Sequence, residues 1–220
     1  MSAASMWTAM QAAIAAVTPY QGSDPIASAA YRAAVGQAMC TAIISEQNTP
    51  VAWDGTNDRV LDVGQFTQDS FTSATSMPLH IACGDGQIYE MEIVGSYTAV
   101  AAAASSYLQP NNAVPATNLF IYREDFGVHL TPTSDAASGF ASGGLYLNGS
   151  YSSILEAFAK IYTSTQNKKS IAIGGASTNT ASYVGTIVTE WQDTTTVWSS
   201  LGTVIMPNAW TGQIVCRRVA

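Results

Sequence analysis

The C-terminal stretch, residues 183–220, constrains the fold most strongly. It contains three apolar runs rich in Val, Ile, Thr and Trp, at residues 183–191, 197–206 and 213–219. These residue types fit a pleated, half-buried surface, and Pro207, Asn208 and Gly212 favour a turn between the last two runs. The stretch therefore predicts three short strands separated by turns.

The pattern from Thr49 onward is also β-like. In the run IYEMEIVGSY, Tyr89 and two further apolar residues alternate with Glu90 and Glu92, which predicts a strand with one face on a core and one in solvent. With the preceding MPLHIAC it predicts a hairpin around the sequence GDGQ. About nine or ten such runs occur without regular strand–helix alternation, so we predict a mainly β fold, a jelly-roll-like β-sandwich, over residues 47–220.

One segment inside this β region has a helical spacing. In SSILEAFAKIYTSTQ, apolar side chains at Ile154, Leu155, Phe158, Ile161 and Tyr162 fall on one helical face. The spacing predicts a short helix of about two or three turns.

Residues 1–46 differ from the rest because they are rich in Ala, the strongest helix former. They predict two helices broken at Gln21, the second with Pro25 in its first turn. Apolar side chains recur at intervals of three and four residues in both helices, an arrangement typical of helix–helix seams. The candidate oligomerisation or attachment residues on these seams are Trp7, Met10, Ile14, Val17, Tyr31 and Val35.

Both helices are nearly uncharged, with Asp24, Arg32 and Glu46 as their only charged residues. A helix without a polar face needs a partner that covers it. Two arrangements satisfy this need: the helices pack on the chain's own β-domain, or they associate between subunits or anchor the chain in a larger assembly.

Composition excludes several classes of function. The net charge is −7 and only 10% of residues are charged, so no basic stripe exists for nucleic acid. No apolar run is long enough for membrane insertion, and the first residues lack the pattern of a signal peptide. The cysteines Cys40, Cys83 and Cys216 are odd in number and widely spaced, which favours three buried free thiols in a protein made in a reducing compartment.

The sequence has no catalytic signature, so we expect no enzymatic activity and no cofactor. Its two histidines, His80 and His129, lie inside β-like runs, where satisfied side chains are the simpler interpretation. The polar cluster that includes Asp54, Asn57 and Asp58 does not match a calcium loop, and we expect no metal there.

Tryptophans beside polar residues suggest a second type of site. An exposed indole stacks on the apolar face of a sugar while nearby amides and carboxylates bind its hydroxyls. Trp53 with Asp54, and Asn208 with Trp210, are the candidate glycan contacts, and Trp210 is the stronger because the sequence places it in a turn.

The C-terminal sequence WQDTTTVWSSLGTVIMPNAWTGQIVCRRVA resembles the end of small β-rich domains in virion surface proteins of tailed bacteriophages and phage-like particles. In that family a Trp-x-Asp-Thr-Thr-x-x-Trp-x-x-Leu-Gly-Thr-Ile/Val segment precedes a final strand with Arg-Arg. The stretches IYEMEIVGSY and LQPNN are similar to the family's middle section. The resemblance covers residues 50–220 in outline and is specific in the C-terminal stretch.

The resemblance implies a fibre, spike or decoration protein that is fixed to a capsid or tail by its N-terminal part. Such proteins are homo-oligomers, often trimers, made in the host cytoplasm and exposed on the virion surface. The absence of a long shaft between the helices and the β-domain favours a short capsid-attached head fibre or decoration protein. The alternative function is a carbohydrate-binding module that recognises a host surface glycan at the tip of a tail fibre or spike.

Overall fold

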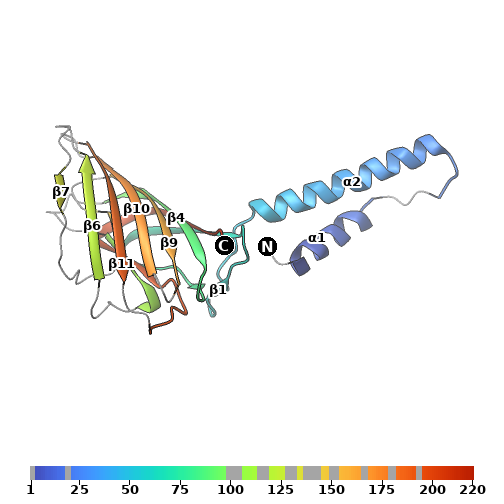
Figure 1. Ribbon diagram of the computed structural model, residues 1–220. Coiled ribbons are helices and arrows are strands. Elements are labelled where there is room, and N and C mark those ends of the chain that lie inside the picture. Colours follow the sequence, from blue (N-terminus) through green and yellow to red (C-terminus); the bar gives the residue numbers. More distant parts are fainter. Residues whose placement is uncertain are drawn as a thin grey trace.

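The computed structural model has two unlike parts, a helical hairpin and a strongly curved β-part (Figure 1). The two parts follow one another in the chain, with the hairpin first. The residues described are 3–17, 21–97, 106–112, 119–126, 133–135, 145–148, 154–164, 168–177, 182–191 and 195–220.

Two helices, α1 (Ala3–Ala15) and α2 (Pro25–Asn48), form the hairpin. The start of α2 is fixed by Pro25 at its first position and by Asp24, whose backbone carbonyl accepts a hydrogen bond of 2.9 Å from Ser28 N. The helical N-terminal segment predicted from the sequence is confirmed.

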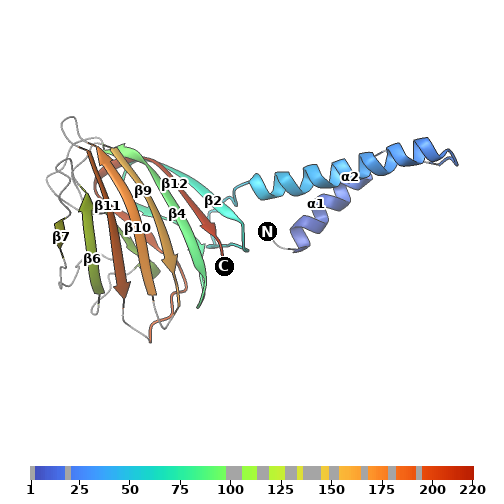
Figure 2. The ribbon, with the colours of Figure 1, turned by 45° about the horizontal axis from the view of Figure 1, so that its top comes forward.

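The hairpin extends away from the β-part. Figures 1 and 2 show α1 lying beside α2, while α2 leads into the sheet only at its C-terminal end. In neither view does a helix lie across the sheet. The arrangement in which the helices pack on the chain's own β-domain is therefore not the one this structure adopts.

In the part of the chain that the structure describes, the strands form one ten-stranded sheet and a separate two-stranded one. The large sheet has the order β7-β6-β11-β10-β9-β4-β12-β5-β8, with β2 also paired to β12, and all its pairs are antiparallel. This confirms the mainly β class, whereas the narrower jelly-roll arrangement is not confirmed. The strands are β1 (Arg59–Val60), β2 (Phe66–Pro78), β3 (Ile81–Ala82), β4 (Ile88–Tyr97), β5 (Ser106–Gln109), β6 (Leu119–Phe126), β7 (Thr133–Asp135), β8 (Leu145–Asn148), β9 (Ile154–Tyr162), β10 (Lys168–Ser177), β11 (Ser182–Trp191) and β12 (Thr203–Arg218); a 3₁₀ turn, η1 (Pro110–Asn112), follows β5.

β12 turns the sheet over on itself. Its residues 210–218 pair with β4, whereas residues 203–205 pair with β5, and β2 accompanies both halves. The register with β2 shifts between Ile205 and Trp210, as expected where a bulge bends two strands round a corner. The turn predicted at residues 207–212 is therefore wrong, because these residues continue one long strand.

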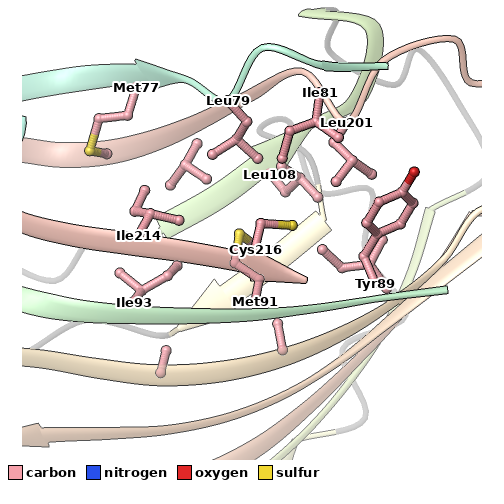
Figure 3. Close-up of a cluster of buried hydrophobic side chains, with 14 of the residues drawn as sticks. Met77, Leu79, Ile81, Tyr89, Met91, Ile93, Leu108, Leu201, Ile214 and Cys216 are labelled. Carbon is pink, nitrogen blue, oxygen red and sulfur yellow. The ribbon is translucent and has the colours of Figure 1, made fainter. Parts of the chain in front are cut away.

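The core lies inside the curved sheet, between strands β4 and β12 on one side and the segments that carry Leu79 and Leu201 on the other (Figure 3). Tyr89, Met91 and Ile93 alternate along β4 and are fully buried, so the predicted alternation is confirmed. Each large apolar side chain buried in this way stabilises the fold by about 1.5 to 3 kcal/mol. Residues that share this core are Leu61, Met77, Leu79, Ile81, Leu108, Trp198, Leu201, Val204, Ile214 and Cys216.

The predicted hairpin around GDGQ is wrong. β3 pairs in parallel with β1, while β4 pairs with β9 and β12. The outward position predicted for the glutamates is consistent with the structure, since Glu92 is exposed and Glu90 lies 3.8 Å from Lys160 of β9.

The predicted helix at residues 152–166 is also wrong. The described residues 154–162 of this segment form β9, which lies between β4 and β10. Ala157, Ala159 and Ile161 are buried, whereas Phe158 is 44% exposed, which is the two-residue period of a strand. The small Ala side chains on the inner face allow β9 to pack under the core.

Candidate assembly surface and ligand site

The apolar seams of the two helices face each other only in part. Met10, Ile14 and Val17, with Tyr31 and Val35 of α2, are half-buried. Because α1 packs on α2 and the hairpin extends away from the sheet, this burial comes from the hairpin itself. Trp7, the remaining predicted residue, is 56% exposed.

The exposed side of α2 carries mostly small, uncharged side chains. Ala30, Ala34, Gln37, Thr41 and Ile44 are all exposed and recur at intervals of 4, 3, 4 and 3 residues. Ile44 is as exposed as Trp7, at 56%. These exposed residues form a second seam with the same spacing as the predicted seam of Tyr31 and Val35. The sequence interpretation missed it because Ala, Gln and Thr do not stand out as apolar.

Arg59 fixes the base of the hairpin to the β-part. Its guanidinium binds both carboxylate oxygens of Asp69 on β2, at 2.9 and 2.6 Å. It also donates to the backbone carbonyls of Val51, Leu79 and His80. With only 6% exposure, this side chain ties the segment after α2 to β2 and to the approach to β3.

An aromatic pair lies next to this clamp. The rings of Trp53 and His80 stack with their centroids 3.6 Å apart and their planes within 5°. Trp53 remains 43% exposed, and His80 Nδ1 lies 3.4 Å from Asp58 Oδ1. The structure thus places one predicted glycan-contact residue in a defined, accessible position.

His80 departs from its predicted position inside a strand. It lies between β2 and β3, is half-buried and has a left-handed backbone with a φ of 50°. Such a conformation is uncommon for a side chain larger than Gly and is held here by the two bonds that Arg59 donates to the His80 carbonyl. The side chain of His129, the second histidine, lies outside the described residues.

Asp54 organises the turn beside Trp53. Its carboxylate accepts hydrogen bonds of 2.8 Å from both Asn57 N and Thr56 N, and a third from the Asn57 side chain. The bond from Asn57 N, followed by that from Thr56 N, lowers the pKa of Asp54, so this exposed carboxylate stays ionised in mildly acidic solution.

Trp210 cannot serve as a sugar platform, and the prediction for it is wrong. The residue lies within β12 and is fully buried. Its predicted partner Asn208 is half-buried in the same bend, and neither Asn208 Nδ2 nor Trp210 Nε1 has a hydrogen-bond partner among the residues that the structure describes. The residues that were expected to form a turn, Pro207 and Asn208, lie instead in the bulged part of β12, and the indole of Trp210 is buried there.

Two facing glycines make room for Trp210. Gly95 of β4 pairs with Gly212 of β12, and a Cβ on either would come within 2.4 Å of the indole. The ring therefore lies directly against the backbone of both strands.

The stretch LQPNN and the segment WSSLGT, both singled out in the sequence, meet in the structure. Asn111 adopts a left-handed backbone, and its side-chain oxygen accepts hydrogen bonds from Ser199 N and Ser200 N. Asn112 accepts a bond from Thr203 at the start of β12. The asparagines thus fasten the segment that enters β12, which explains their presence structurally.

The three cysteines lie in different environments. Burial, with a smaller effect from Asp58, raises the pKa of Cys83 to about 12, and burial raises the pKa of Cys216 as well. Both remain protonated thiols at neutral pH. Cys216 is buried, Cys83 is half-buried and Cys40 is exposed on α2, so the prediction of three buried thiols is confirmed for Cys216 alone.

Within the described ranges, His, Cys, Asp and Glu side chains do not gather in groups of three that could hold a metal ion. Among the same residues, no helix is both long and apolar enough to cross a membrane. Comparison with known protein families, with curated proteins and with solved structures finds no match.

Proposed function

We propose that this chain is a structural protein of a phage-like particle, a short capsid-attached fibre or decoration protein. In this proposal the helical hairpin associates with other copies or with neighbouring virion proteins of the capsid or tail, and the β-part faces outward. The particle assignment rests on the resemblance of the C-terminal stretch to virion surface proteins.

One observation carries the assembly part of the proposal, namely the exposed, nearly uncharged hairpin. Trp7 and Ile44 are each 56% exposed on a hairpin that extends away from its own sheet. Apolar residues gathered on a helix that has no polar face are covered in stable proteins by a partner. A second and third copy of the same hairpin supply such a partner, so we propose a homo-oligomer, with a trimer favoured.

The finer fold assignment belongs to the same proposal. The corner at β2 and β12 brings β8, the strand next to β5, against β9, β10 and β11, which supports a two-layered sandwich. A jelly-roll-like arrangement of those layers, as in many capsid-associated domains, stays a prediction that an experimental structure of the assembled protein would test.

Light scattering coupled to size-exclusion chromatography tests the association. We expect the full chain to form an oligomer, and Ile44→Glu to release monomers because a charge enters the covered seam. The matched control is Val63→Glu, since Val63 is 57% exposed but lies in the β-part. A monomeric full chain, or equal effects of the two variants, contradicts the assembly proposal.

Location on a particle needs a separate measurement. An antibody raised against the β-part should label the outside of intact particles in negatively stained images, and the label should disappear from particles that lack the chain. Labelling only of disrupted particles would contradict an exposed position.

Recognition of a host surface glycan is the second candidate function, and the exposed Trp53 favours it. The indole offers a flat apolar face, and Asp54 follows it directly in a rigid turn. A glycan array probed with the full chain and with Trp53→Ala tests this function. Glycans that bind both proteins equally would remove Trp53 from the site.

A further inference from the structure

We propose that the Trp53–His80 stack is a binding site for a ligand that carries an ammonium group, such as an amino sugar or a quaternary amine. This inference deepens the second candidate function and rests on it, because both use Trp53. It adds a chemical class of ligand, a cation, which the glycan function alone does not specify.

The geometry provides a fixed aromatic surface. The His80 ring covers one face of Trp53 at 3.6 Å, so the exposure of the indole, 43%, comes from the rest of its surface. His80 is held in turn by Asp58 at 3.4 Å and by the backbone bonds from Arg59. An immobilised ring loses little conformational entropy when a ligand binds.

The charges near the stack are acidic. Asp54 lies next to Trp53 in the chain, and Asp58 contacts the stacked imidazole. The single base in residues 51–65 is Arg59, and its guanidinium is paired with both oxygens of Asp69. Asp54 keeps its charge because of the backbone donors of its turn.

An indole close to two carboxylates favours a cation over a neutral ligand. A positive group is attracted by the electron-rich face of Trp, the aromatic side chain that binds cations best. The carboxylates add a Coulombic attraction that is screened by salt. A neutral sugar receives the stacking contribution alone, and an anionic ligand is repelled.

Calorimetric titration of the full chain separates these cases. The probes are choline and glucosamine, which carry an ammonium group, and glucose and N-acetylglucosamine, which are neutral. We expect the charged probes to bind about tenfold more tightly than the neutral ones. The comparison of choline with glucosamine shows whether the site prefers a quaternary amine or an amino sugar.

Variants locate the site. Trp53→Ala should weaken choline and glucosamine binding about tenfold or more, and Asp58→Asn should weaken it by a few fold. Trp7→Ala is the matched control, because Trp7 is even more exposed but lies on the hairpin, and it should leave binding unchanged. Addition of salt to about 1 M should reduce the preference for charged probes.

Each remaining outcome contradicts the inference in a distinct way. Equal binding of charged and neutral sugars overturns the ammonium site but leaves glycan recognition intact. Absence of binding by every probe, or binding that Trp53→Ala does not change, removes the ammonium site, and the glycan array with Trp53→Ala then decides separately whether Trp53 recognises another sugar. The particle-assembly proposal is unaffected by either result because it is measured by oligomeric state.

Discussion

The hairpin and the β-part bury their side chains to very different extents. None of the helix side chains described, at residues 7–15, 27–45 and 48, is buried, although α2 alone has 24 residues. In the β-part, Trp198, Trp210 and Tyr89 are all fully buried. The β-part therefore has a hydrophobic core of its own, whereas the hairpin depends on local helix propensity and on the packing of α1 against α2.

This difference in burial indicates which interactions define the structure of each part. Close packing defines the β-part, so small changes of volume should be costly there. The hairpin has open space around it, so equal changes should alter helix content or association but not the core. Four predictions test this contrast.

The largest effect is expected at Gly202, in the segment that leads into β12. This glycine has a φ of 78°, and a Cβ at this position would overlap with the backbone oxygen of Gln109. We expect Gly202→Ala to lower the free energy of unfolding by about 3 kcal/mol or more, as measured by urea denaturation.

The matched control for this change is Gly36→Ala on α2, where a Cβ meets no atom within 4 Å. This variant should gain up to about 1 kcal/mol of helix stability and leave the unfolding of the β-part unchanged. If the two substitutions have similar effects on the urea transition, the contrast between the parts fails.

Removal of the Arg59 side chain should cause the second largest loss in the free energy of unfolding. We expect Arg59→Ala to cost about 3 kcal/mol, the lower end for a broken buried ion pair, because Asp69 is partly accessible to water. Thermal and urea unfolding measure the loss. Arg217→Ala is the control: this exposed side chain lies 5.3 Å over the Phe66 ring, and its removal should cost no more than about 1 kcal/mol.

Alkaline pH should weaken the β-part selectively. The pKa of Cys83 is raised from 9.0 to about 12, so above pH 9 the unfolded chain loses this proton while the folded chain keeps it. Stability is therefore retained below pH 9 and falls by about 1.4 kcal/mol per pH unit up to about pH 12 for this thiol. Urea unfolding between these pH values should show a shallower decline in Cys83→Ala, and an unchanged decline would contradict the assignment.

The smallest expected effect is in the hairpin. Ala33 is exposed on α2, and Ala33→Gly should reduce helix stability by about 1 kcal/mol. Circular dichroism should show less helix, while tryptophan fluorescence of the buried core should follow the same urea transition as before. A coupled shift of both signals would mean that the hairpin and the β-part unfold as one unit.

The sequence predicted the parts whose signals are local. Ala content and Pro25 identify the helices, and the alternation around Tyr89 identifies β4, because propensity and period are properties of short segments. In β9 the same local information was ambiguous. Apolar residues occupy both the helical and the strand positions of this segment, and the neighbouring strands β4 and β10 determine the outcome.

The candidate sites depended on burial, which the sequence does not report directly. Trp53 and Trp210 have similar polar neighbours, yet one is exposed and the other is enclosed by a bulge and two glycines. The bulge replaces the expected turn because β2 pairs with β12 before and after it, while β5 pairs with the first half of β12 and β4 with the second. Long-range pairing of this type joins residues more than a hundred positions apart and leaves no local pattern.

The length of α2 gives the Arg59 clamp a mechanical role. A helix of 24 residues reaches about 36 Å, so a rotation of roughly 10° at its base swings the far end by about 6 Å. The hydrogen bonds of the Arg59 guanidinium to its carboxylate and carbonyl partners hold the base of the helix and so limit this rotation. In the proposed oligomer, a slight loosening at Arg59, too small to unfold the sheet, would shift the far ends of the hairpins relative to one another.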